Sequence, residues 1–180
     1  MNDPFEMLGL EPRFDLDPDE LGRRHRELSK ALHPDRYASA PAAERRMALS
    51  RAIEVNEAMR ALRDPIKRAE ALARRHKLAV GETTEPKPSP ALLMEMMEAR
   101  EELADAGKKK DAGALGKLGD AMRKREAGVL DRLGAAFSAG ASDPTKLDAV
   151  LPLLGELRYV RRFLDEVSAL EEAALHDASS

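Results

Sequence analysis

The stretch that decides the fold is residues 17–37, which read DPDELGRRHRELSKALHPDRY. Asp17 is a favourable N-cap and Pro18 suits the first position of a helix, so a helix should begin at Pro18. Its inward positions recur at spacings of four, three and four residues and share one face: Leu21, His25, Leu28 and Leu32. Pro34 disfavours the helical conformation of the preceding residue, so the helix should end at His33.

A second helix is predicted after this loop by an apolar stripe of similar spacing: Ala48, Ala52, Val55, Met59 and Leu62. Two amphipathic helices of similar length joined by a loop should pack as an antiparallel hairpin. The loop carries the tripeptide His33-Pro34-Asp35, which we call the HPD loop.

Two further helices should flank this hairpin. A short one, lying across the pair, is expected to carry Phe5, Leu8 and Leu10. Asp64-Pro65 has the same pattern as Asp17-Pro18, an N-cap followed by proline, and predicts a helix that extends to about Lys77. We therefore assign residues 1–78 to one helical domain.

A linker over residues 79–90 separates this domain from the rest of the chain. Three prolines in five positions cannot continue a helix, and the stretch shows no apolar periodicity. At its end, Ser89-Pro90 again combines a cap with a first-position proline. The helix that follows should end near Gly107 and carries Leu93, Met96, Met97, Arg100 and Leu103.

Two more helices are predicted beyond it. The second should close near Gly140 and carries Leu115, Leu118, Met122, Val129, Leu133 and Phe137. The third should start at Asp143-Pro144 and carries Leu147, Leu151, Leu154, Leu157, Leu164, Val167 and Leu170. Pro152 should kink this helix or shift its start. Residues 91–180 are thus expected to form a three-helix, up-down-up bundle, which makes the whole chain all-α.

Composition excludes several classes of function. The 180-residue chain has a net charge of −3, 3% aromatic residues and no cysteine. Lack of cysteine removes disulfides and thiolate metal sites and fits a reducing compartment. No apolar run is long enough for a membrane span and the N-terminus has no signal core, so we expect a cytoplasmic protein. We expect no nucleic-acid partner, no cofactor and no metal, and a monomer.

Seven segments carry a family resemblance that extends over nearly the whole chain. In the first half they are FEMLGL (5–10), LHPDRY (32–37), IEVNEA (53–58), LRDP (62–65) and RAE (68–70). In the second half they are LMEMMEAREEL (93–103) and LRY (157–159). Together they resemble HscB, the J-type co-chaperone family of iron–sulfur cluster assembly.

The resemblance implies two activities. The J-domain would stimulate ATP hydrolysis by a DnaK-type, HscA-like chaperone. The C-terminal bundle would bind the IscU-like scaffold protein of iron–sulfur cluster assembly and deliver it to that chaperone. The family is not an enzyme family, so no catalytic residue is expected.

The HPD loop and the helix before it supply the candidate contacts to the chaperone: His33, Pro34, Asp35, Arg23, Arg26 and Lys30. A proline-fixed turn would hold Asp35 for a bidentate arginine of the partner, and His33 should order the turn or donate a hydrogen bond. The three cations lie off the apolar stripe and could steer an acidic surface. His25 is expected to be a half-buried packing residue.

The resemblance places the contacts to the scaffold on two helices of the bundle: Leu93, Met94, Met97, Glu98, Glu101, Arg158 and Tyr159. The Leu and Met residues near position 94 cover more than one stripe of a helix, so some of them must be exposed. We expect Leu93, Met94 and Met97 to lie beside Tyr159 in one exposed apolar surface.

Three other interpretations compete with this one. A J-domain adaptor for a different client would share the first half of the chain. An enzyme that uses His33 and Asp35 as an acid and base pair is disfavoured, because no second reactive cluster converges with them in the sequence. A metal protein is weaker still, since the four histidines show no ligand spacing.

Overall fold

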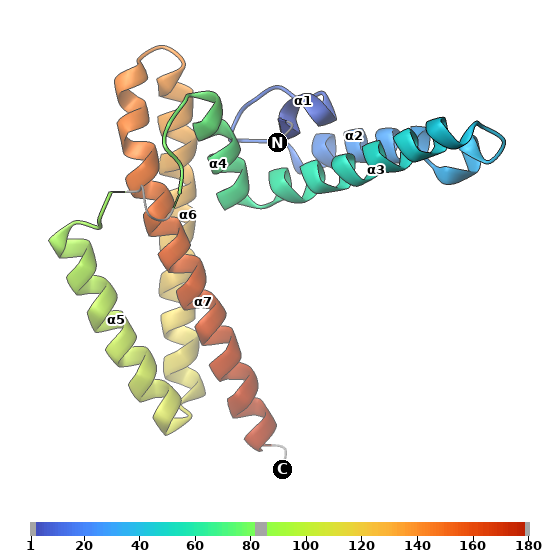
Figure 1. The fold of residues 1–180 in the computed structure, drawn as a ribbon. Helices are drawn as coiled ribbons and strands as arrows, with labels where there is room; N and C mark the ends of the chain where they lie inside the picture. Colours follow the sequence, from blue (N-terminus) through green and yellow to red (C-terminus); the bar gives the residue numbers. More distant parts are fainter. Residues whose placement is uncertain (1–2, 82–85, 179–180) are drawn as a thin grey trace. The chain divides into compact units, whose positions relative to one another are not determined.

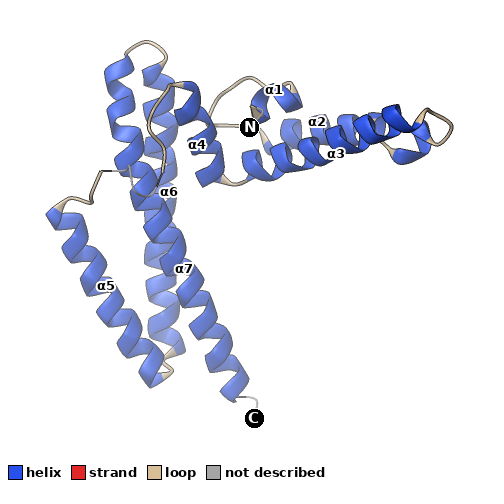
Figure 2. Cartoon of the chain, in the orientation of Figure 1, coloured by secondary structure: helices blue, strands red, loops and turns tan. Residues whose placement is uncertain are grey.

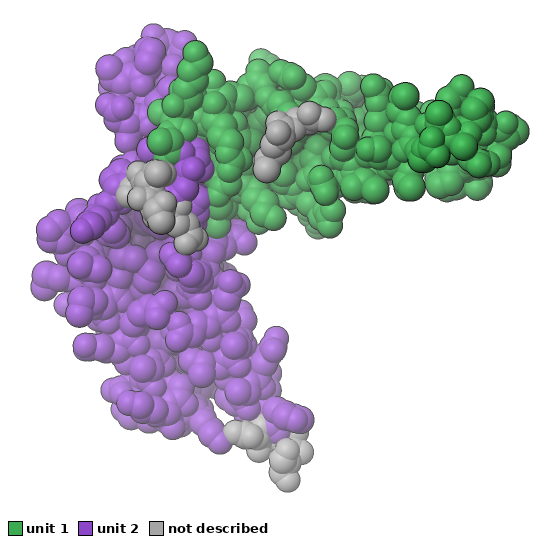
Figure 3. All heavy atoms as spheres, in the orientation of Figure 1, with its two compact units in different colours: residues 1–79 green, residues 80–180 purple. Residues whose placement is uncertain are grey.

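The computed structural model describes residues 3–81 and 86–178 of the chain. Every regular element within these residues is a helix (Figures 1 and 2), so the predicted all-α fold is confirmed. The chain divides into two compact units, residues 1–79 and 80–180 (Figure 3). None of the helices in the described part is long and apolar enough to cross a membrane.

The first unit comprises α1 (Pro4–Leu8), α2 (Pro18–Ala31), the 3-10 helix η1 (Pro34–Tyr37), α3 (Ala42–Arg63) and α4 (Pro65–Arg75). Three of them start with an aspartate whose carboxylate accepts the N–H two residues further on, followed by proline: Asp3, Asp17 and Asp64. This local hydrogen bond satisfies one of the free amides of the first turn. The starts of α2 and α4 are therefore where the sequence predicts them.

The predicted hairpin is formed by α2 and α3, with α1 lying against α3. Its core consists of buried apolar side chains from all four α-helices and the segment after α1: Phe5, Leu8, Phe14, Leu21, Val55, Leu62 and Leu72. His25 is half-buried, as predicted, and its Nε2 lies 2.8 Å from Asn56 Oδ1. This hydrogen bond joins α2 to α3 in the middle of the hairpin.

Arg24 has a structural role that the sequence did not reveal. Its Nε donates to the Leu8 carbonyl at 3.3 Å and its Nη2 to the Gly9 carbonyl at 3.2 Å. Gly9 has a φ of +62°, and a Cβ at this position would lie 2.4 Å from Arg24 Nη2. Arg24 therefore ties the end of α1 to α2, and glycine provides both the backbone conformation and the space.

The second unit comprises α5 (Pro90–Lys109), α6 (Ala112–Gly140), the 3-10 helix η2 (Pro144–Ala149) and α7 (Val150–Ala178). The predicted start of the third helix was wrong, because the segment after Asp143 is a 3-10 helix and α7 begins only at Val150. Pro152 is the third residue of α7, where a missing N–H leaves no intrahelical bond unmade. Of the two outcomes expected for this proline, the shifted start is the one observed.

One core cluster of the second unit lies where α5 packs on the long pair α6 and α7 (Figure 1). Its buried residues are Leu103, Ala106, Leu115, Met122, Tyr159, Val160, Phe163 and Val167. The side of α5 that turns toward this core also brings Met96 and Ala99 against it. The opposite side of α5 is consequently left to solvent.

Candidate functional site

The HPD loop forms the turn η1, shortly after α2 ends at Ala31. His33 is the N-cap of this turn and Pro34 occupies its first position. The His33 Nδ1 atom accepts the backbone N–H of Asp35 at 3.3 Å. His33 therefore orders the turn as an acceptor, while proline fixes the backbone that follows it.

The Asp35 side chain of this loop is more exposed than that of His33. It is 90% exposed, and its Oδ2 lies 3.5 Å from His33 Nδ1. A short carboxylate on an ordered turn has few conformations to lose on binding. It can therefore accept two parallel hydrogen bonds from an arginine of another protein.

Three cations lie on the solvent side of α2 and lead toward the HPD loop. Arg23, Arg26 and Lys30 are all exposed, and their spacing of three and four residues places them on one face. Arg24 is turned away from this basic face by its bonds to α1. The result is a positively charged strip on the helix that precedes the HPD loop.

The second candidate region is the α5 outer face, which we define as Leu93, Met94, Met97, Glu98 and Glu101. Its three apolar side chains are 49%, 63% and 58% exposed, in that order, and both glutamates are exposed. The expectation that part of the Leu and Met cluster faces solvent is therefore correct. Large apolar side chains in a group on one helix face mark an interaction surface more often than scattered ones do.

The expectation that Tyr159 belongs to this same exposed surface was wrong. Tyr159 and Arg158 are each only 8% exposed. The Tyr159 hydroxyl donates to the Met96 carbonyl at 2.9 Å, on the inward side of α5. Tyr159 thus contacts the side of α5 that faces the core, whereas Leu93 and Met97 lie on the other side.

Tyr159 is held by several contacts in this position. Its ring centroid lies 6.2 Å from that of Phe163, and the Arg100 guanidinium lies 5.9 Å from the Tyr159 centroid. Burial raises the pKa of the Tyr159 phenol, against the opposing effect of the Arg100 charge. The neutral phenol is therefore the form that links α5 to α7.

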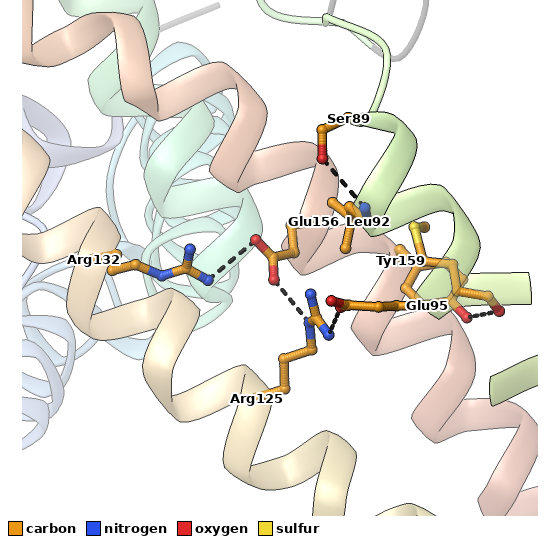
Figure 4. Close-up of polar contacts among 8 residues, drawn as sticks. Ser89, Leu92, Glu95, Arg125, Arg132, Glu156 and Tyr159 are labelled. Carbon is orange, nitrogen blue, oxygen red and sulfur yellow. Dashed lines mark hydrogen bonds and ion pairs between the residues drawn. The ribbon is translucent and has the colours of Figure 1, made fainter. Parts of the chain in front are cut away.

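A groove of about 780 Å³ lies beside Tyr159, between the N-terminal part of α5 and the α6 and α7 pair. Figure 4 shows its polar floor, where Glu156 lies between two arginines of α6. Arg125 Nε donates to Glu156 Oε1 at 2.8 Å and Arg132 Nη2 donates to Glu156 Oε2 at 3.1 Å. Arg125 also donates to Glu95 of α5 at 2.8 Å. These bonds connect the three helices around the groove.

The network also affects the pKa of Arg125, in a direction that favours its charged form. Burial alone would lower the pKa of Arg125, but the hydrogen bonds and the negative charges of Glu95 and Glu156 outweigh it, and the pKa is raised. The buried Glu156 carboxylate is thus fully compensated by two cations. Nothing in the sequence spacing indicated this network, because its members are separated by 24 to 31 residues.

A helical hairpin with an exposed HPD loop after a basic helix defines the first unit as a J-domain, and the second unit is a separate helical bundle. Comparison with family models agrees with both. Residues 3–71 match the model described as the DnaJ domain. Residues 88–168 match the model described as the HSCB C-terminal oligomerisation domain.

Two relatives extend the match along the chain. The chain is 36% identical over 172 residues to the co-chaperone protein HscB homolog of Burkholderia mallei, covering 96% of this chain and 95% of that one. It is 43% identical over 117 residues to the homolog of Bordetella pertussis, covering 65% and 68%. The solved structure of the chaperone HscB from Vibrio cholerae superimposes with a TM-score of 0.81 at 28% identity, covering 96% and 99%.

The chain belongs to the HscB family of J-domain co-chaperones. The resemblance inferred from the seven sequence segments is therefore confirmed. The family is one of co-chaperones and is not an enzyme family. The second family model is described as an oligomerisation domain, whereas we expect a monomer. The oligomeric state therefore stays a prediction.

Proposed function

We propose that this chain activates an HscA-like, DnaK-type chaperone through the HPD loop and delivers an IscU-like scaffold protein to it. We assign the first task to residues 1–78 and the second to residues 91–180, joined by the linker 79–90. The observation that carries the proposal is the Asp35 carboxylate, 90% exposed on an ordered turn. The chain itself acts as an activator and a carrier, and the ATPase chemistry belongs to the partner.

Contact with the chaperone would combine two kinds of interaction. Asp35 offers a bidentate acceptor for one arginine of the partner, and His33 keeps the turn in place. Arg23, Arg26 and Lys30 provide a positive field that attracts an acidic partner surface and raises the association rate. The chain would act in the cytoplasm, where ATP is available to the chaperone.

Contact with the scaffold would use the α5 outer face. Leu93, Met94 and Met97 supply exposed apolar area, and flexible methionines adapt to an uneven partner. Glu98 and Glu101 would form an acidic rim. Tyr159 and Arg158 remain part of the proposed client site, but as residues reached from the groove rather than from the outer face.

The experiment that tests this function measures the steady-state ATPase rate of an HscA-like chaperone in three mixtures. These contain the chain alone, the IscU-like scaffold alone, or both proteins together. A carrier that binds chaperone and client at once should give a rate with both that exceeds the sum of the two separate stimulations. A rate equal to that sum would show that the chain does not deliver this client, and would favour an adaptor for a different protein.

A further inference from the structure

We propose that the groove beside Tyr159 is a second client contact, which binds an acidic segment of the client that also carries an apolar side chain. This inference rests on the proposed function, since the occupant is the same IscU-like scaffold. It adds to that function a contact on the other side of α5 from the outer face. It also predicts which kind of client residue is recognised there.

The shape of the groove suits a short stretch of polypeptide. Its volume of about 780 Å³ falls in the range of sites that enclose a small ligand or a few side chains. One wall is formed by Leu92 and Met96 of α5 and the other by Leu153 and Tyr159 of α7. An apolar side chain entering between these walls would be buried on both sides.

The positive charge of the groove favours an acidic partner. Four cations line it, namely Lys87, Arg132, Arg158 and Arg162, against a single carboxylate, Glu156. Glu156 is already bonded to Arg125 and Arg132, so the charge of Arg132 is offset within the chain. Lys87 and Arg162 are exposed at the rim, where they can meet the carboxylates of an incoming segment. Apolar walls with a positive rim are complementary to Asp or Glu next to an apolar residue.

The groove adjoins the α5 outer face, which favours the client as its occupant. Leu92, which lines the groove, is followed directly by Leu93, the first residue of the α5 outer face. A protein that covers the outer face therefore reaches the groove by crossing the N-terminal turns of α5.

The test compares scaffold binding by three double variants, measured by calorimetry at low and high salt. Lys87→Glu with Arg162→Glu reverses two rim charges and should weaken binding at least about ten-fold at low salt. The difference in affinity between this variant and the wild type should shrink in about 0.5 M NaCl, because salt at this concentration screens exposed charges. Lys117→Glu with Lys124→Glu makes the same charge change at exposed positions of α6 and should leave affinity unchanged.

Leu93→Ala with Met97→Ala separates this inference from the proposed function. If this variant loses affinity while the rim variant binds like the wild type, the groove inference is overturned and the client site on the outer face stands. If the rim variant and the Lys117, Lys124 control lose affinity equally, only net charge matters and the groove is again excluded. A wild-type chain that fails to bind the scaffold at all would overturn both proposals.

A cross-link identifies the occupant directly. Because the chain has no cysteine, Lys87→Cys provides a unique attachment point for a photoreactive label at the rim. The groove inference predicts a cross-link to an acidic segment of the scaffold. A cross-link to a second copy of the chain, or none to the bound scaffold, would contradict it.

Discussion

Tyr159 shows what a single residue contributes at the contact between two helices. Its hydroxyl reaches the Met96 carbonyl on α5, and its ring packs near Phe163 on its own helix. A phenylalanine could fill the same space but could not make the hydrogen bond. The residue therefore contributes both apolar burial and a polar link across the groove wall.

Tyr159→Phe should change the pH dependence of stability. Burial raises the pKa of Tyr159 above its value in the unfolded chain. The stability due to the neutral phenol is therefore present below about pH 10 and lost as pH rises through the folded-state pKa. At pH 8 the variant should be about 1 kcal/mol less stable than the wild type, through loss of the hydrogen bond. Urea unfolding at pH 8 and pH 11 should show this difference shrinking, and two curves falling in parallel would contradict it.

The HPD loop was predictable from its residues because the determinants are local. Proline fixes the backbone after His33 and a short carboxylate follows, so the turn and the exposure of Asp35 depend on neighbours in the sequence. The burial of Tyr159 was not predictable in the same way. It depends on which side of α5 turns toward α7, and periodicity within one helix does not specify its rotation against another.

At the scale of the element, α5 has two apolar sides, one that packs in the core and one that faces solvent. Leu103 and Ala106 on the inward side are buried, while Leu93 and Met97 are about half exposed. Helices whose starts combine a cap with proline were predicted correctly, as at Ser89 and Pro90. The segment after Asp143 has the same start signal, yet it forms a 3-10 helix before α7. The sequence signal marks a turn start but does not specify how far the helix continues.

The two sides of α5 should differ in their effect on stability. Leu103→Ala removes a fully packed side chain and should lower the free energy of unfolding by about 2–4 kcal/mol. Leu93→Ala with Met97→Ala removes two exposed side chains and should change it by less than about 1 kcal/mol. Denaturant unfolding of both variants checks this. A collapse of stability in the Leu93, Met97 variant would mean that these residues belong to the core.

At the scale of the whole molecule, the chain consists of two units with separate cores, residues 1–79 and 80–180. Each unit carries one of the proposed partner surfaces. Under the proposed function, such a division would keep chaperone activation and client binding on separate units, and a linker would raise the effective concentration of one partner near the other. This gain would disappear if the units were separated.

A fragment of residues 1–78 should therefore stimulate the chaperone weakly and should not bind the scaffold. Its core, which includes Phe5, Leu21 and Leu62, lies entirely within the fragment, so we expect it to fold. ATPase assays and calorimetry with the purified fragment measure the two activities separately. Scaffold binding by the fragment would show that the client site has been assigned to the wrong unit.

The measurement that tests the central claim most directly is the ATPase rate of an HscA-like chaperone with the Asp35→Asn variant. The change keeps the size of the side chain but removes the charge that would meet an arginine, and the exposed position predicts no effect on folding. Asp131→Asn, at an exposed site on α6, is the matched control. We predict that Asp35→Asn abolishes stimulation, with unchanged circular dichroism, while the control stimulates like the wild type. Stimulation by Asp35→Asn at the wild-type level would contradict the assignment of the HPD loop as the activating surface.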